Sequence, residues 1–423
     1  MSKLKKLDIE LLIFLFCLFF QNFAIIRTSS FGISVIVLFL IYAFFRYKFY
    51  KELSKKFILF VITTIIFILI SSKINNIFNI FQIVRYFLCV FVAYTSYFYI
   101  KNLIKNDKTE KLLNYSLNFC LILCIYGIYQ VYASRNHWPM FLNVFNNNPS
   151  YAVRGIFEVY GGWVSFDRVY TTFFEPSIYA VFLVNLLFIF IMFKEKDERT
   201  KFKLRYTIFL MLINLFLTFS RAGWVIFVCY LGIFIYYKLF SKYKIMSKIG
   251  KIMIINLPFI ILATMYFIGL IMFSDQSSLT RTYSSLFYLV NSFKKVIFVL
   301  FGHGLNVMSF SNYCVSFQKV FIEPFAHNGY IEIAYQFGWL YLLYLLFVVN
   351  RFIDKGLKKF NWFPYAAVVS VCCFGAIYNV DSLTTLIVMI ICLSKFYNRS
   401  EVWYQLYAQV MMKKYWINIY FHL

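Results

Sequence analysis

Long apolar runs separated by short polar segments dominate this chain of 423 residues. About 20 residues of α-helix cross the roughly 30 Å hydrocarbon core of a bilayer, and shorter runs suffice when Tyr, Trp and Lys anchor their ends. Such runs lie near 9–26, 31–45, 57–72, 77–100, 111–133, 173–193, 205–219, 222–240, 252–273, 329–349, 362–379 and 382–396. The pattern predicts an all-α membrane protein, a polytopic bundle of about 12 transmembrane helices.

Basic residues gather in alternate connections between these runs. The basic connections are 46–56, 101–111, 194–205, 238–251 and 351–359. Because Lys and Arg accumulate on the cytoplasmic side of membrane proteins, we expect these connections and both termini to be cytoplasmic. The long connections 134–172 and 274–328 are then extracytoplasmic loops. No repeat, linker or soluble segment interrupts the pattern, so residues 1–423 form one integral membrane domain.

The apolar segment 286–301 has two interpretations. Lys294 and Lys295 interrupt it, and one more span would upset the alternation of basic connections. An interfacial amphipathic helix is therefore favoured over a further span.

Composition supports a membrane protein and argues against a nucleic-acid partner, a metal site and a nucleotide-binding loop. Hydrophobic residues make up 62% and charged residues 14% of the chain. The net charge of +25 comes from clusters between apolar runs, not from one amphipathic face, so it indicates topology and not a nucleic-acid partner. The nine cysteines are dispersed, without CxxC pairs, and no metal or cofactor is expected. The fragment 302–304, GHG, lacks the spacing of a nucleotide loop and predicts a backbone turn.

A few ionisable residues stand in or beside apolar runs, away from the cytoplasmic clusters. They are Arg85, Arg168, Glu175, Arg221, Arg281, Glu323, His327, Glu332 and Asp381. A charge among lipid tails is costly, so such residues face a bundle interior, a wet cavity or each other. They are the candidates for function.

Each candidate also has a structural interpretation. Arg221, in LTFSRAGW, is either an interfacial anchor of a tight turn or a fixed guanidinium for phosphate. Glu175 precedes Pro176, which is well placed to begin a helix, so helix capping competes with substrate binding. Arg168 is harder to explain by structure alone, and Arg281 has the alternative of an interfacial anchor.

His327 stands at the mouth of the predicted span 329–349, in IEPFAHNGY. An imidazole titrates near neutral pH and can act as a base on a hydroxyl, although a lone interfacial histidine is often only a polar anchor. Asn328 is its neighbour, and Glu323 could orient it if the intervening turn is helical. Spacing alone leaves both interpretations of His327 open.

Five short segments together resemble the superfamily of O-antigen polymerases and O-antigen ligases. They are RVYTTFFEPSIYA (168–180), LTFSRAGW (217–224), the arginine of SSLTRTYSSLF (277–287), FGHGLN (301–306) and AHNGYIEIAYQFGWL (326–340). They occur in the family's order and cover the second half of the chain, whereas the first 150 residues match only in hydropathy.

The resemblance implies a metal-independent glycosyltransferase in the bacterial cytoplasmic (inner) membrane, with an extracytoplasmic site and an undecaprenyl-pyrophosphate-linked oligosaccharide as donor. It implies that Arg221, with Arg281 and Arg168, binds the pyrophosphate, and that His327 activates the acceptor hydroxyl. Glu175, Glu323, Asn328 and Arg85 complete the expected substrate-binding set. A chain-length regulator and a flippase of the same pathway are expected partners.

Three functions remain open on sequence grounds. A repeat-unit polymerase of O-antigen or capsule is favoured, because the motifs are diffuse and the loop before His327 is modest. A ligase would transfer the glycan to lipid A core of lipopolysaccharide. A flippase for the lipid-linked oligosaccharide belongs to another class, and Arg85 in the fourth run suits it best; the lack of repeat halves argues against it.

Overall fold

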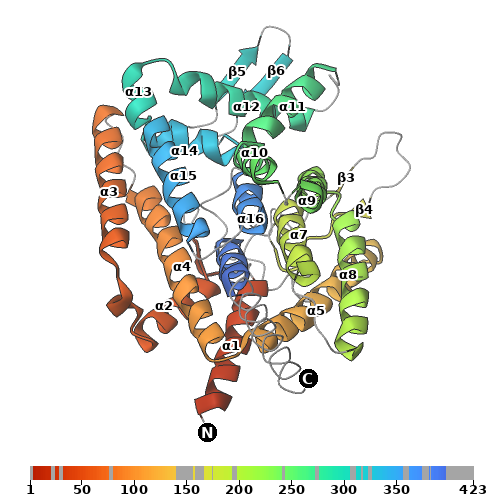
Figure 1. The fold of residues 1–423 in the computed structure, drawn as a ribbon. Helices are drawn as coiled ribbons and strands as arrows, with labels where there is room; N and C mark the ends of the chain where they lie inside the picture. The colour runs from red at the N-terminus through yellow and green to blue at the C-terminus, as the bar shows by residue number, and fades with distance from the viewer. Residues whose placement is uncertain are drawn as a thin grey trace, which may run out of the picture.

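The computed structural model describes the greater part of the chain (Figure 1). The described residues are 3–20, 24–27, 32–75, 80–139, 156–157, 166–173, 175–192, 198–240, 243–271, 276–304, 311–315, 318–322, 326–355, 362–373, 381 and 383–396. They are mostly helical, as the hydropathy pattern predicts. Three short antiparallel strand pairs occur among them and were not expected.

The helices follow the apolar runs. They are α1 (Lys3–Phe19), α2 (Val35–Arg46), η1 (Phe49–Glu52), α3 (Lys55–Asn75), α4 (Ile80–Lys105), α5 (Thr109–Arg135), α7 (Pro176–Met192), α8 (Glu198–Leu217), α9 (Arg221–Phe240), α10 (Lys244–Ile255), α11 (Leu257–Ile271), α12 (Gln276–Ser292), α13 (Val296–Phe301), α14 (Gly329–Phe337), α15 (Trp339–Asp354) and α16 (Trp362–Cys372). A further apolar helix covers Leu383–Phe396. The strand pairs are β1–β2 (Ala24–Arg27, Gly32–Ser34), β3–β4 (Ile156–Phe157, Phe166–Asp167) and β5–β6 (Ser311–Val315, Gln318–Ile322).

The chain is a helical membrane protein. Among the described residues four helices are long and apolar enough to cross a bilayer: Lys55–Ile74, Ile83–Lys105, Thr109–Arg135 and Arg221–Phe240. A bent pair, Ile245–Ile255 and Leu257–Thr264, makes a fifth if it is counted as one span, with a bend of 61°. The other predicted runs contain helices that are shorter, broken or, like α8, less apolar, so the count of about 12 expected from hydropathy is not confirmed.

Two predicted spans differ in detail from the observed helices. The run 9–26 ends its helix at Phe19, and Ala24–Arg27 instead pairs with Gly32–Ser34. The segment 286–301 is not one helix, because α12 ends at Ser292 and α13 begins at Val296. The predicted loop 274–328 thus contains α12, α13 and the β5–β6 pair.

The run 329–349 is divided at Gly338 into α14 and α15. Gly338 has φ +91°, and a Cβ there would lie 2.3 Å from the carbonyl oxygen of Leu300. The GHG fragment causes this close approach: it forms the predicted turn, and the amides of His303 and Gly304 donate to the carbonyls of Tyr335 and Gln336 at 2.7 and 2.9 Å. The turn therefore caps the last residues of α14, whose carbonyls have no partner within the helix.

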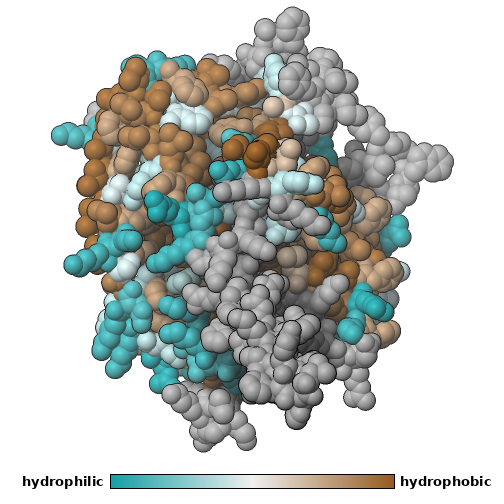
Figure 2. Space-filling model, viewed as in Figure 1, coloured by the Kyte–Doolittle hydropathy of each residue, from teal (hydrophilic) through white to brown (hydrophobic). Residues whose placement is uncertain are grey.

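Apolar packing joins the helices into a main core and two smaller clusters. The main core unites α1, α2, α4, α5, α7, α8, α9, α16 and Leu383–Phe396. α14 belongs to both smaller clusters, one with α3, α4 and α15 and the other with α11 and α12. Figure 2 shows apolar side chains over the upper part of the surface near α3, and hydrophilic ones toward the N-terminal end. Exposed Leu59 and Leu69 of α3 belong to a surface suited to lipid.

Candidate functional site

Buried polar groups fix the segment that carries Arg168. The side-chain oxygen Oε1 of Gln130, in α5, accepts from the amides of Tyr170 and Thr171 at 3.1 and 3.0 Å. Gln130 is only 1% exposed, and its interior hydrogen bonds replace those that the irregular backbone would otherwise make with water. The amide of Val169 donates to the carbonyl of Leu217 at 3.1 Å. The segment after β4 is thereby held against the end of α8.

Arg168 and Arg221 meet at the turn between α8 and α9. Nε of Arg168 donates to the carbonyl oxygen of Thr218 at 2.8 Å. Ser220 caps α9, since its Oγ accepts from the amide of Gly223 at 3.1 Å. Arg221 is the first residue of α9 and is exposed. The turn is as tight as the sequence indicates, and it presents the Arg221 side chain at a helix amino end.

Glu175 and Pro176 begin α7 as predicted. Pro176 is the first helical residue, and the carbonyl of Glu175 accepts from the amides of Ile178 and Tyr179, both at 3.2 Å. The Glu175 side chain is half-buried. The backbone of Glu175 therefore starts the helix, and its carboxylate interacts electrostatically with Arg168.

Arg168, Glu175, Arg221 and Arg281 form one electrostatic group, which we call the arginine cluster. Glu175, Arg281 and Arg221 all act on the charge of Arg168, and Arg281 also acts on Arg221. Burial lowers the pKa of the Arg168 guanidinium; Glu175 raises it, and the two positive neighbours lower it further. An arginine remains protonated under such shifts. The fold thus gathers residues from three distant segments.

The face of α12 that carries Arg281 also holds the chain beside His327. Oγ of Ser285, one turn after Arg281, lies 2.9 Å from the Arg281 carbonyl oxygen and also hydrogen-bonds to the carbonyl oxygen of Ala326. His327 follows directly, is half-buried and has φ +50°, an uncommon backbone state for a residue other than glycine. Ser285 therefore links the predicted base to the arginine cluster.

Asn328 is the amino-terminal cap of α14. Its Oδ1 accepts from the amides of Tyr330 and Ile331 at 3.1 and 3.3 Å, and its Nδ2 donates to the carbonyl of Pro258 at 3.0 Å. The side chain is buried, with 4% exposed. Asn328 thus positions the residue before it and anchors α14 on α11.

Arg85 lies in different surroundings from the other candidate arginines. The charges that act on it are Asp381 and Glu332, and it is not among the charges that act on Arg168 or Arg221. Glu323 lies outside the described residues. Of the eight residues expected to form the site, the fold brings Arg168, Glu175, Arg221 and Arg281 together, with His327 and Asn328 tied to them through α12.

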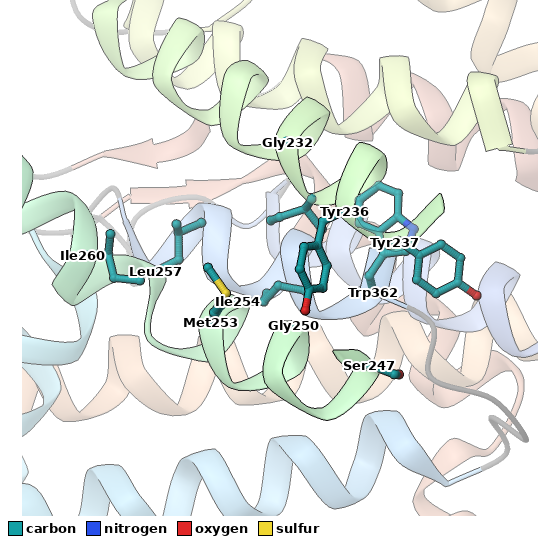
Figure 3. A pocket seen from close by; sticks show the side chains of 11 residues that line it. Gly232, Tyr236, Tyr237, Ser247, Gly250, Met253, Ile254, Leu257, Ile260 and Trp362 are labelled. Atoms are coloured by element: carbon teal, nitrogen blue, oxygen red, sulfur yellow. The ribbon is translucent and has the colours of Figure 1, made fainter. Parts of the chain in front are cut away.

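An apolar pocket of about 250 Å³ lies between α9, α10, α11 and α16 (Figure 3). Its lining residues are Gly232, Ile233, Tyr236, Tyr237, Ser247, Gly250, Met253, Ile254, Leu257, Ile260 and Trp362. A Cβ built on Gly232 meets nothing within 4 Å, so this glycine opens into the pocket. Arg221 starts the same helix, 11 residues or roughly 16 Å from Gly232.

Sequence reasoning missed Gln130 and Ser285, the two side chains that place Arg168 and His327. Gln130 could have been found in the sequence, because it is a polar residue inside the apolar run 111–133. Within the described part of the chain no group of three or more His, Cys, Asp and Glu side chains is arranged to hold a metal ion. No protein-family model, curated protein or solved structure matches the chain.

Proposed function

We propose that this protein is a surface-polysaccharide repeat-unit polymerase. It transfers the growing O-antigen or capsule glycan from undecaprenyl pyrophosphate to a hydroxyl of a lipid-linked repeat unit. The observation that carries the proposal is the convergence of Arg221, Arg281 and the carboxylate of Glu175 on Arg168.

The charge of the arginine cluster favours an anionic ligand. Three guanidinium groups and one carboxylate leave a net charge of +2, and like charges held together in a partly buried site repel each other strongly. A pyrophosphate relieves that repulsion and accepts paired hydrogen bonds from guanidinium groups. The exposed Arg221 is accessible to such a ligand.

The proposed reaction is a displacement at the anomeric carbon. The acceptor oxygen forms a bond to that carbon, the bond from carbon to the pyrophosphate oxygen breaks, and the pyrophosphate leaves with the electron pair. His327 takes the proton of the acceptor hydroxyl. The arginine cluster stabilises the charge that grows on the leaving group, because guanidinium groups stay protonated throughout.

The proposal includes a location. The alternation of basic connections supports a multi-pass protein of about 12 spans in the bacterial inner membrane, with both termini cytoplasmic. The loops 134–172 and 274–328 and the site are then extracytoplasmic, where the sugar and pyrophosphate remain in water. The pocket beside Gly232 is apolar enough to receive part of the undecaprenyl chain.

A ligase that transfers the glycan to lipid A core is the second candidate, since it uses the same kind of donor. Deletion of the gene separates the two: single repeat units on lipid indicate lost polymerisation, whereas accumulated lipid-linked polymer indicates a ligase. A flippase is less well supported, because Arg85, the residue that suits transport, is balanced by Asp381 and Glu332.

The direct experiment is conversion of lipid-linked repeat units to oligomers by the purified protein in lipid nanodiscs. We expect Arg221→Ala and His327→Ala each to lower turnover roughly 100-fold. Arg205→Ala and His137→Ala are matched controls, because both side chains are exposed and lie outside the cluster.

Full turnover by both site variants, at normal protein levels, would show that the assigned mechanism is wrong. Absence of any oligomer with wild-type protein and the correct repeat unit would reject the polymerase itself.

A further inference from the structure

A second group of charged side chains gathers where four distant segments meet. Arg85 of α4 interacts electrostatically with Glu332 of α14 and with Asp381, which precedes the helix Leu383–Phe396. Oγ of Ser34, just before α2, donates to Oδ2 of Asp381 at 2.6 Å. Two carboxyl groups interact with one guanidinium, so this group carries less positive charge than the arginine cluster.

Two acceptor oxygens in this region have no hydrogen-bond partner in the described part of the chain. They are Oε2 of Glu332 and Oε1 of Gln336, and both atoms are buried. The two side chains stand one turn apart on α14, and Nε2 of Gln336 reaches Oε1 of Glu332 at 3.4 Å. Buried polar atoms nearly always have a partner, so paired acceptors without one indicate a ligand or water that donates hydrogen bonds.

Further unsatisfied polar atoms surround the end of α14. Nδ1 of His303 and Oγ of Ser72 are buried without a partner among the described residues. The turn 302–304 brings them close to α14, since the His303 amide donates to Tyr335 and a Cβ on Gly304 would lie 3.7 Å from Cα of Ser72. The region therefore offers both acceptors and donors, which is the requirement of a hydroxyl group.

This region is less suited to the donor's pyrophosphate than the arginine cluster is, because it carries less positive charge. It suits a neutral molecule with many hydroxyls. Glu332 follows His327 by five residues, roughly 7 Å along α14, a separation that neighbouring sugar rings can bridge.

We propose that Glu332, Gln336, Arg85 and Asp381 form a carbohydrate subsite that binds hydroxyl groups of the acceptor repeat unit. This proposal rests on the proposed function for the identity of the sugar as the acceptor. It assigns the pyrophosphate to the arginine cluster and the acceptor sugar to this subsite, which includes Glu332 and Gln336 of α14, the helix that begins beside His327.

The test is binding of the free repeat-unit oligosaccharide, released by mild acid from the host's lipid-linked glycan, to the full-length protein in nanodiscs. We expect Glu332→Gln to weaken this binding roughly tenfold or more, because one carboxyl oxygen that hydrogen-bonds the sugar is replaced by an amide NH2 group. Binding of undecaprenyl pyrophosphate should not change. In turnover, KM for the acceptor should rise while KM for the donor stays constant.

Glu110→Gln is the matched control, an exposed carboxylate on α5 outside both clusters, and should bind like the wild type. Wild-type affinity in Glu332→Gln with an unchanged unfolding temperature would overturn the subsite. If Glu332→Gln unfolds, Gln336→Ala provides the second test, and unaltered oligosaccharide binding there would also overturn it. Oligosaccharide binding that depends on Glu332 without any polymerisation would retain the subsite and reject the polymerase.

Discussion

Three backbone groups hold the side-chain amide of Asn328: Oδ1 accepts from two amides of α14, and Nδ2 donates to the carbonyl of Pro258. It therefore contributes to the candidate site by placing His327 at the start of α14. Arg168 combines both roles, because its Nε holds the turn at Thr218 while its charge belongs to the arginine cluster. The role of a polar residue near a site thus depends on which of its atoms hold the backbone and which can reach a ligand.

His303 provides a prediction about pH. Its ring lies between Phe298 and Tyr335, with centroids 3.9 and 4.2 Å away, and burial lowers its pKa from 6.5 to about 4. Between those values the unfolded chain binds a proton that the folded chain does not. The contribution of His303 is therefore fully present above pH 6.5 and decreases as the pH falls toward 4.

His303→Phe keeps the aromatic stacking and removes the titration. We expect the unfolding temperature of the variant in detergent to fall less than that of the wild type between pH 7 and pH 5. Parallel curves for the two proteins would contradict the assignment.

At the scale of elements, the division between α14 and α15 is set by contact between two backbones. Gly302 and Gly338 approach so closely that a Cβ on Gly302 would lie 2.6 Å from the amide nitrogen of Gly338. Because α13 and α15 pack on each other through this contact, the hydrophobic run alone does not decide where the helix breaks. The break in turn fixes the end of α14, whose beginning carries His327.

Gly338→Ala should destabilise the protein by about 2 kcal/mol or more, because alanine at φ +91° is strained and its Cβ meets the Leu300 carbonyl. Thermal unfolding of the purified protein in detergent measures the effect. Gly232→Ala is the control, since space is open around it. Equal unfolding temperatures of the two variants would contradict the contact.

The pocket beside α9 gives a second prediction for an element. Gly232→Leu extends a side chain into the pocket from a position where a Cβ meets no atom within 4 Å. The fold should therefore persist while KM for the undecaprenyl-linked donor rises roughly tenfold, as buried methylene contacts are lost. Val228→Leu, at a position on α9 that is 61% exposed, should leave KM unchanged. A wild-type KM in the Gly232 variant would remove this pocket from the proposal.

At the scale of the whole molecule, apolar surface and basic connections together define a membrane protein with a proposed orientation. The exposed apolar residues of α3 and α9 agree with contact to lipid. The basic segments 46–56 and 238–251 would face the cytoplasm. In that orientation the arginine cluster faces outward, where a translocated lipid-linked glycan would meet it.

Fusions to a fluorescent protein that folds only in the cytoplasm test the orientation. Fusions after Tyr243 and after the last residue, Leu423, should fluoresce, whereas a fusion after Gly304 should not, because positive connections stay inside. Equal expression of all three fusions is the control. Fluorescence after Gly304 would place the candidate site on the cytoplasmic face and contradict the proposed function.

The sequence by itself determined the helical membrane class, the position of most helices, the start of α7 at Pro176 and the GHG turn. These features depend on local chemistry: hydropathy over one span, the fixed φ of proline and the freedom of glycine. Only the tertiary structure decided that Arg168, Arg221 and Arg281 converge and that Arg85 belongs with Glu332 and Asp381. Those groupings depend on which helices pack together, and contacts between distant segments leave no periodic signal along the chain.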